Sequence, residues 1–299
     1  MPVVAFIGLG MMGLPMAARL VKAGFETRGA DLSPTAREAF SAAGGAAFSA
    51  AGGAAFADAC EAVAGAGVVI TMLPDGKIVR EVLLGLAADL PSGTLIIDMS
   101  SSAPLGTVKL GEELAAKGLR FIDAPVSGGV RRAVNGTLAI MAGGPQADVE
   151  TARPVLEAMG QSLFGTGPLG SGHAMKALNN YVSAAGLVAA AEAIIVAKRF
   201  GLDPNVAVDV LNASTGKNNS TEVKMKQFII SESFGSGFSL ALMAKDLRTA
   251  AELADQLDLP IPAIQSTADL WDKANAALER GADHTEIYRF LAQISADKS

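Results

Sequence analysis

The stretch GHAMKALNNY, Gly172–Tyr181, sets one lysine among apolar residues and follows it with two asparagines. Residues three and four positions apart share a helix face, so we expect Asn179 and Asn180 to lie beside Lys176 and hold its amine. Lysine is almost never fully buried without a partner, and burial lowers the pKa of its amine. Lys176 is therefore predicted to be a general acid/base. The alternatives are a solvated surface lysine, or His173 as the acid/base, although His173 is interpreted first as an orienting or structural residue.

A glycine-rich turn near the N-terminus has the spacing of a dinucleotide-binding loop. GLGMMG, Gly8–Gly13, matches G-x-G-x-x-G and follows a strand-like run. Gly8 allows a tight turn, Gly10 lets the backbone approach a pyrophosphate, and Gly13 permits close packing of helix on strand. The amino end of that helix attracts phosphates. The predicted cofactor-binding residues of this segment are Gly8, Gly10, Met11, Met12 and Gly13.

Asp31 indicates which dinucleotide is bound. It lies at the end of the second predicted strand, where a carboxylate can accept hydrogen bonds from both ribose hydroxyls. The same charge would repel the 2′-phosphate of NADP. Arg28 is three residues earlier, so on a strand it points to the opposite face. We expect NAD as the cofactor, with NADP the less favoured one.

Ser127, Gly128 and Gly129 offer a second binding element. A hydroxyl followed by two residues without side chains can present successive backbone N–H groups to a carboxylate. A plain turn after a strand is the alternative interpretation. The segment predicts a small anionic substrate.

Alternating strand-like and helical segments are predicted to position these residues. Apolar runs that end in glycine or in an acid before a loop are typical of an α/β protein with a doubly wound Rossmann sheet. The second predicted helix begins with Ser33 as N-cap and Pro34 at its first position. The predicted strands are Val3–Ile7, a short one that reaches Ala30-Asp31, Val68–Met72, Thr94–Asp98, Leu119–Asp123 and Leu138–Ala142.

The pattern changes after about residue 165. Gly172–Arg199 reads as one continuous helix, and no strand is predicted beyond it. Further helices are predicted at 204–214, 221–232, 239–258 and 262–280. We therefore expect an NAD-binding Rossmann domain at 1–165 and an all-helical substrate and dimerisation domain at 166–299, joined by a long interdomain helix.

Composition excludes several classes of function. The chain has 299 residues, half of them hydrophobic, and a net charge of -6, so we expect a globular protein that does not bind nucleic acid. One cysteine, Cys60, and two histidines leave no expected disulfide or metal site. The N-terminus runs directly into a strand pattern, and the apolar stretch Val182–Ala197 is too short for a membrane span. We expect a cytoplasmic protein without a membrane partner.

The octapeptide SAAGGAAF occurs twice in tandem, at Ser41–Phe48 and Ser49–Phe56. One interpretation is a flexible lid. The other is a short duplication that is tolerated on the surface between a helix and a strand. The second is favoured because neither copy holds a group capable of chemistry.

Four motifs, in order, make the chain resemble the β-hydroxyacid dehydrogenase family, which includes 3-hydroxyisobutyrate dehydrogenase and tartronate semialdehyde reductase. They are FIGLGMMGLPMA at Phe6–Ala17, DAPVSGGVRRAVNGTLAIMAGG at Asp123–Gly144, GHAMKALNN, and LMAKDL at Leu242–Leu247. The resemblance covers essentially the whole chain. It implies reversible NAD(P)-dependent oxidation of a hydroxyl β to a carboxylate, giving a semialdehyde, by a homodimer or homotetramer.

The resemblance also implies roles for further residues. Leu73, Pro74 and Ser101 match family residues beside the nicotinamide ribose. Lys245 matches a lysine that closes the site from the second domain, next to both substrate and cofactor. Family members that use NADP often carry Asn-Arg where this chain has Asp31-Leu32, in agreement with the charge argument.

One segment departs from the family. Thr215–Lys224, TGKNNSTEVK, replaces the aromatic-containing stretch expected of a hydroxyisobutyrate enzyme. Its amides and hydroxyls favour a substrate more hydrophilic than hydroxyisobutyrate. Two alternatives stay open: a non-catalytic NAD-binding sensor or binding module, and a reductase of another carbonyl or an imine on the same scaffold.

Overall fold

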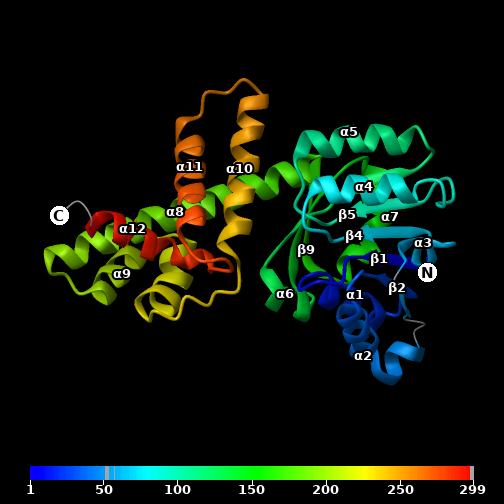
Figure 1. Cartoon of the computed structure of the whole chain (residues 1–299), viewed down its shortest axis with the longest axis horizontal. Coiled ribbons are helices and arrows are strands. Elements are labelled where there is room, and N and C mark those ends of the chain that lie inside the picture. The colour runs from blue at the N-terminus through cyan, green and yellow to red at the C-terminus, as the bar shows by residue number, and fades with distance from the viewer. Residues whose placement is uncertain (51–53, 57, 297–299) are drawn as a thin grey trace. The chain divides into compact units, whose positions relative to one another are not determined.

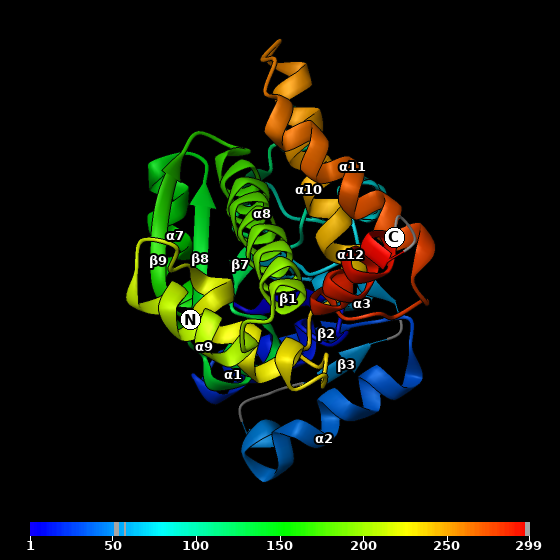
Figure 2. The same cartoon turned by 90° about the vertical axis from the view of Figure 1, so that its left-hand side faces the viewer.

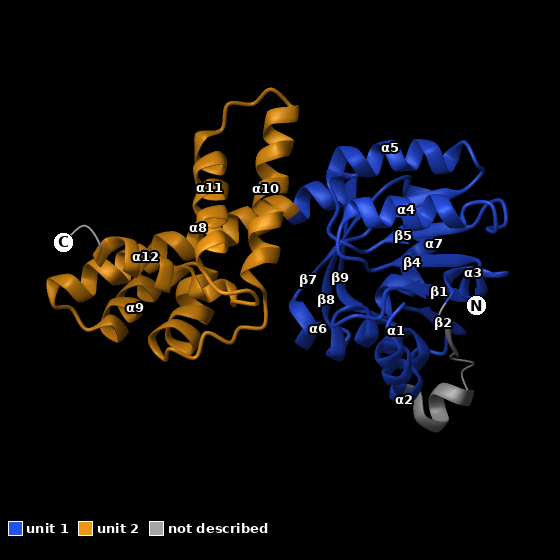
Figure 3. Cartoon of the chain, viewed as in Figure 1, with its two compact units in different colours: residues 1–176 blue, residues 177–299 orange. Residues whose placement is uncertain are grey.

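The computed structural model describes residues 1–50, 54–56 and 58–296. The chain forms two compact units, Met1–Lys176 and Ala177–Ser299, which Figure 3 distinguishes by colour. The first unit is built on a sheet and the second on helices. The predicted fold class, a Rossmann sheet followed by an all-helical part, is therefore confirmed.

One mostly parallel sheet organises unit 1. Within the described residues it has nine strands in the order β3-β2-β1-β4-β5-β6-β8-β7, with β9 paired to β8. Strands β1 to β6 run parallel, whereas β8 is antiparallel to β6 and β7. The strands are β1 (Val4–Ile7), β2 (Thr27–Ala30), β3 (Ala54–Phe56), β4 (Val68–Thr71), β5 (Leu95–Asp98), β6 (Arg120–Asp123), β7 (Val126–Ser127), β8 (Leu138–Gly143) and β9 (Gly160–Gly167).

Six of these strands were predicted from the sequence, and each predicted boundary agrees to within one or two residues; for β2 only the end was predicted. The sequence analysis missed β3, β7 and β9. Strand β7 is only two residues long, and β9 carries three glycines and no alternation of apolar residues. These segments are strands because β2 and β8 offer them a pairing edge, which local sequence does not encode.

Helices cover both faces of this sheet (Figure 1). Successive strand residues point to opposite faces, so Phe6 enters one core and Ala5 the other. Helices α1 and α7 contribute to the first core, and α3, α4 and α5 to the second. The helices of unit 1 are α1 (Gly13–Lys22), α2 (Pro34–Ala50), α3 (Ala59–Val63), α4 (Gly76–Leu86), α5 (Pro104–Ala115), α6 (Gly129–Asn135) and α7 (Gln146–Glu157).

The named elements of unit 2 are all helices within its described residues, and α10 and α11 lie side by side in both views (Figures 1 and 2). Trp271, Leu187 and Leu247 lie at the centre of its core. The sequence analysis missed the last helix and did not foresee that the segment near 221–232 is a π-helix. The elements are α8 (Ser171–Phe200), α9 (Pro204–Ala213), the π-helix η1 (Ser220–Ile230), α10 (Leu240–Gln256), α11 (Pro262–Ala277), the short 3₁₀ turn η2 (His284–Glu286) and α12 (Ile287–Ala296).

Helix α8 begins in unit 1 and continues into unit 2. By length and composition alone it could cross a membrane. Its Ala184, Leu187, Ala191 and Ile194 are buried in the core of unit 2, however, with exposures of at most 1%. These four residues make α8 part of the core of unit 2.

The tandem octapeptide was expected on the surface between a helix and a strand, and the structure extends both elements into it. Its first copy, Ser41–Phe48, lies within α2, and residues 54–56 of the second copy form β3. Alanine is the best helix former, which accounts for the extension of α2 through the first copy. Residues 51–53 lie outside the described residues.

Candidate active site

The glycine loop after β1 has the backbone that the sequence predicts. Gly8 has a φ of 98°, and a Cβ there would lie 2.3 Å from the carbonyl oxygen of Met72. A Cβ on Gly13 would lie 1.8 Å from the carbonyl oxygen of Gly8. At Gly10, by contrast, a Cβ would meet no atom within 4 Å. The fold itself requires glycine at positions 8 and 13. Gly10, by contrast, leaves open space that fits the approach of a pyrophosphate.

Next to Gly10, the side chain of Met11 is 75% exposed, and Met12 is half-buried and packs against the core of unit 1. Both residues lie between the carboxyl end of β1 and the amino end of α1. In an open parallel sheet, ligands bind beyond the carboxyl ends of the strands where the strand order reverses. The order β2-β1-β4 reverses at this point. The loop therefore fits a bound dinucleotide.

Asp31 is fixed beside this loop. Its Oδ2 accepts a hydrogen bond of 2.7 Å from the N–H of Leu9, and its Oδ1 accepts one of 2.8 Å from the N–H of Ser33. Arg28 is directed elsewhere and donates to the carbonyl of Ala64. As predicted, Arg28 does not neutralise the carboxylate.

A second arginine near Asp31 was missed from the sequence. Arg37, one turn into α2, donates to the carbonyl oxygens of Asp31 and Leu32 at 2.7 and 3.0 Å. Its spacing from Ser33, the N-cap, could have indicated that it reaches back over the helix end. Arg37 holds the strand-to-helix turn that presents Asp31.

The loop after β4 is tied to the end of β5. The N–H of Leu73 donates to Oγ of Ser100 at 2.9 Å, and the N–H of Ser100 donates to Oδ1 of Asp98 at 3.0 Å. Pro74 follows on the exposed side, and Ser101 is half-buried. The residues predicted beside the nicotinamide ribose therefore lie on two loops that one hydrogen-bonded chain connects.

Asp123 connects α8 to the sheet. At the end of β6, its two carboxylate oxygens accept hydrogen bonds of 2.7 Å from the N–H groups of Gly170 and His173. Burial raises the pKa of Asp123, while His173 and these two hydrogen bonds act in the opposite direction. A Cβ on Gly172 would lie 2.2 Å from the carbonyl oxygen of Met141. Glycine at this position lets the first turn of α8 approach β8 closely.

His173 is enclosed in unit 1, with 1% exposure. Its Nδ1 lies 2.8 Å from Oγ1 of Thr107, and its Nε2 lies 3.6 Å from a carboxylate oxygen of Asp98. The imidazole thus lies among side chains of β5, α5 and β6. This setting favours the structural interpretation of His173 over a role as acid/base.

Lys176 follows one turn later and is half-buried. The two asparagines after it are linked to each other, because Nδ2 of Asn179 donates to Oδ1 of Asn180 at 3.1 Å. Nδ2 of Asn180 donates to Oδ2 of Asp246 in α10 at 2.6 Å. The sequence analysis expected Asn180 to serve the lysine and missed its bond to Asp246. Asp246 is the aspartate of the LMAKDL motif, and that motif could have suggested this hydrogen bond.

Lys245 precedes that acid in α10. Its Nζ lies 3.6 Å from Oδ1 of Asp246, and its side chain is 30% exposed. Asp246 itself is 3% exposed. The LMAKDL motif therefore combines a buried carboxylate that orients α8 with a more accessible amine.

The predicted carboxylate-binding turn lies between β7 and α6. Ser127 ends β7, and the next two glycines have φ values of 131° and 66°, which side-chain-bearing residues rarely adopt. A Cβ on Gly129 would meet no atom within 4 Å. The positive φ values and the open space fit the nest of N–H groups expected from the sequence.

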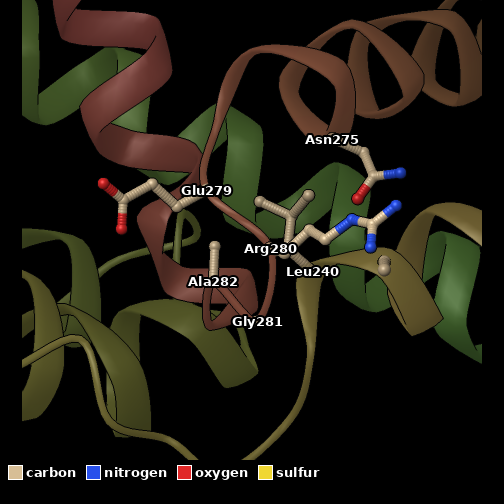
Figure 4. Close-up of a pocket in the computed structure, with 7 residues that line it drawn as sticks. Leu240, Asn275, Glu279, Arg280, Gly281 and Ala282 are labelled. Carbon is tan, nitrogen blue, oxygen red and sulfur yellow. The ribbon is translucent and has the colours of Figure 1, made fainter.

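Two other features bear on the site's chemistry. Among the described residues, no group of three His, Cys, Asp or Glu side chains could hold a metal ion. A hollow of about 250 Å³ in unit 2 is lined by residues of α10, of α11 and of the segment after α11, and it contains none of the predicted site residues. Figure 4 shows Asn275 and Arg280 in this hollow turned toward each other, with Glu279 directed away.

Comparison with protein families matches both parts of the chain. Residues 3–167 match the NAD-binding domain of 6-phosphogluconate dehydrogenase. Residues 170–291 match the NAD-binding family of NADP-dependent 3-hydroxyisobutyrate dehydrogenase. Together the two matches span nearly the whole chain.

Similar proteins give the same result. The chain is 35% identical to 2-(hydroxymethyl)glutarate dehydrogenase of Eubacterium barkeri, with 98% of this chain and 95% of that protein covered. It is 39% identical to the NAD-dependent L-serine dehydrogenase of Pseudomonas aeruginosa, over 84% and 85% of the two chains. The structure of Mycobacterium tuberculosis 3-hydroxyisobutyrate dehydrogenase with L-serine superimposes with a TM-score of 0.88 at 37% identity, over 97% and 99% of the chains. The chain therefore belongs to the β-hydroxyacid dehydrogenase family and is an NAD-binding oxidoreductase that acts on CH–OH groups.

Proposed function

We propose that the protein oxidises a small β-hydroxy acid to its semialdehyde, or catalyses the reverse reduction, with Lys176 as general acid/base. When bound, NAD supplies the hydride acceptor. The observation that carries the proposal is the fixed start of α8: Asp123 ties its first turn to the carboxyl end of β6. That edge of the sheet is also where the glycine loop opens, so Lys176 lies one helical turn from an anchor on the cofactor-binding edge.

Each predicted residue then has a task. The amine of Lys176 takes the proton of the substrate hydroxyl during oxidation and returns it during reduction. Gly8, Gly10, Met11, Met12, Gly13, Asp31, Leu73, Pro74 and Ser101 hold the cofactor. Ser127, Gly128 and Gly129 hold the substrate carboxylate, and Asn179, Asn180 and Lys245 orient the substrate, with Lys245 also next to the cofactor.

The names of the relatives indicate a class of substrate, the β-hydroxy acids. The names of the relatives specify 2-(hydroxymethyl)glutarate, L-serine and 3-hydroxyisobutyrate. All three compounds carry a hydroxyl on the carbon β to a carboxylate, and they differ in the group at the α-carbon. We propose that this chain acts on the same hydroxy-acid core. NAD is preferred over NADP because Asp31 repels a 2′-phosphate.

We further propose that residues 1–165 bind NAD and that residues 166–299 bind substrate and form a homodimer or homotetramer. The protein works in the cytoplasm. Its single cysteine, Cys60, is a free thiol, as expected in a reducing compartment.

The test is NADH formation from a panel of β-hydroxy acids, followed by substitution of Lys176. Lys176→Ala is expected to lower kcat about 10²–10⁴-fold, while the dissociation constant of NADH, measured by fluorescence, stays within a few-fold. Lys176→Arg should fail nearly as badly because a guanidinium does not release its proton in this pH range. Lys198→Ala, on an exposed face of the same helix, is the matched control.

Two outcomes would contradict the proposal. Retention of more than about a tenth of kcat by either Lys176 variant would remove this residue as acid/base and make His173 the next one to test. Tight NADH binding without turnover of any hydroxy acid would favour the NAD-binding sensor.

A further inference from the structure

Lys224 ends the segment Thr215–Lys224, in which the chain departs from the family, and the proposed mechanism does not use it. Lys224, on the π-helix η1, is half-buried, and its Nζ donates to Oγ of Ser183 in α8 at 3.2 Å. Its neighbours in sequence behave differently. Lys217 pairs with Glu222 at 2.9 Å, and Lys226 pairs with Asp209 at 2.6 Å. Within the described part of the chain, Lys224 forms no ion pair of this kind.

The amine of Lys224 is positively charged at neutral pH, and the acidic group near it, Asp283, is bound to other donors. Burial lowers the pKa of its amine to about 8, and the nearby Asp283 acts in the opposite direction. The Asp283 carboxylate is occupied by donors from Ser236, Gly237 and Thr285. His284 stays neutral because its pKa is lowered to about 4, first by burial. At pH 7 the amine is therefore mostly charged, and among the described residues its hydrogen-bond partner is the hydroxyl of Ser183.

Asn218 and Thr221, in the same segment, hold the start of η1 together. Oδ1 of Asn218 accepts hydrogen bonds from the N–H groups of Ser220 and Thr221. Lys224 is the member of Thr215–Lys224 whose charged group reaches α8. Long π-helices are rare, and π-helical turns occur frequently at functional sites. Here the π-helix directs one cation inward and leaves Lys226 on the surface.

Ser183 relates this amine to Lys176. The two residues are seven positions apart on the continuous helix α8, so they lie on the same face, about 10 Å apart along the axis. Asn179 and Asn180 occupy the turn between them. One face of α8 thus carries the proposed acid/base at one position and, two turns further on, the hydroxyl that binds the amine of Lys224.

We propose that Lys224 and Ser183 bind a second acidic group, a carboxylate or sulfonate, at the far end of the β-hydroxy acid. This inference rests on the proposed function and narrows its substrate class to dianions. An ammonium has three donors, of which Ser183 uses one. The remaining donors can bind an anionic tail while Lys176 takes the proton of the hydroxyl.

The experiment compares substrates whose distal group is either an acid or the corresponding amide. The two groups differ in charge but have nearly the same shape. The probes are 2-(hydroxymethyl)succinate, 2-(hydroxymethyl)glutarate, the amide of each at the distal carboxyl, and a sulfonate analogue with its sulfonamide. We expect the wild-type protein to prefer at least one acid over its amide by about 10- to 100-fold in kcat/KM, as a charge-assisted hydrogen bond provides. Lys224→Met should raise KM for that acid by the same factor, with kcat and the KM of the amide within about threefold.

Further variants separate this role from a structural one. Lys224→Arg retains the charge and should keep most of the preference, and Ser183→Ala should weaken it several-fold. Lys226→Met, two residues away and paired with Asp209, is the matched control and should change neither KM. Thermal unfolding of each variant shows that the fold is intact.

The outcomes distinguish the two proposals. If the wild-type protein oxidises the amides as well as the acids, or if Lys224→Met raises both KM values equally, the dianion site is wrong and the proposed function stands. If no member of the panel yields NADH but L-serine or 3-hydroxyisobutyrate does, the dianion site is wrong and the proposed function stands; if none of these hydroxy acids yields NADH, both proposals fail.

Discussion

The carboxylate of Asp123 lies 2.7 Å from the backbone nitrogen of His173 and accepts its hydrogen bond across 50 residues of sequence. Its other oxygen accepts from Gly170 at the same distance. Strand β6 and the start of α8 are thereby fixed to each other. The position of the first turn of α8, just before Lys176, depends on a charge that burial makes costly to keep.

Asp123→Asn tests this anchor. An amide can accept at only one of its two ends, so one N–H at the start of α8 loses its partner. We expect the free energy of unfolding to fall by about 1–3 kcal/mol and kcat to fall with it. Chemical denaturation measures the first effect. Glu113→Gln, which breaks an exposed ion pair with Arg80, should cost less than about 1 kcal/mol; an equal loss in both variants would argue against the anchor.

Asp31 is expected to set the cofactor preference. The wild-type protein should favour NAD over NADP by at least about tenfold in kcat/KM, and Asp31→Asn should reduce that ratio by about tenfold for each 1.4 kcal/mol of repulsion removed. Asn keeps an acceptor for the N–H of Leu9 or Ser33, so the turn should persist. Glu38→Gln removes an exposed charge from α2 and serves as the control. Equal use of both cofactors by the wild-type protein would refute the role of Asp31.

Deletion of one SAAGGAAF copy should leave the enzyme active. The two possible deletions yield the same polypeptide, and the remaining copy still supplies Ala-Ala-Phe for the position of β3 beside β2. The deletion therefore shortens the carboxyl end of α2. We expect kcat within about twofold and a small change in unfolding temperature. A large loss of activity would show that the duplication has a function.

His284 should make stability depend on pH in acid. Burial, with the charge of Lys224, holds its pKa at about 4 in the folded protein, below its ordinary value of 6.5. Between these values the unfolded chain binds a proton that the folded chain does not. Stability should therefore fall as the pH drops from 6.5 to 4, by up to about 1.4 kcal/mol per pH unit and about 3 kcal/mol in all.

His284→Asn isolates this effect. The amide can still donate to the carbonyl of Phe238, as Nδ1 of His284 does, but it does not titrate. Unfolding by denaturant at several pH values should give a flatter dependence for the variant between pH 4 and 6.5. Parallel curves for the two proteins in this window would assign the acid sensitivity to other groups.

Features with a local cause could be predicted from the sequence. Apolar runs specify β1, β4, β5 and β6 because a parallel strand covered on both faces must be apolar at nearly every position. Gly8 and Gly13 could be assigned because the positive φ of Gly8 and the approach of Gly13 to the carbonyl of Gly8 belong to the strand-to-helix turn itself. The same reasoning identified Asp31. Local sequence also indicated that Lys176 shares a helix face with two asparagines.

Only the tertiary structure decided which distant groups those residues meet. Asn180 donates to Asp246, 66 residues away, and Asp123 binds the backbone of α8. Lys224 and Lys226 are two positions apart in a polar segment, yet one reaches Ser183 and the other pairs with Asp209. Long-range contacts and π-helical geometry separate them, and neither leaves a local pattern. The sequence by itself therefore determined the fold class and the chemistry available, whereas packing determined that the amine of Lys224 meets a hydroxyl and that of Lys226 a carboxylate.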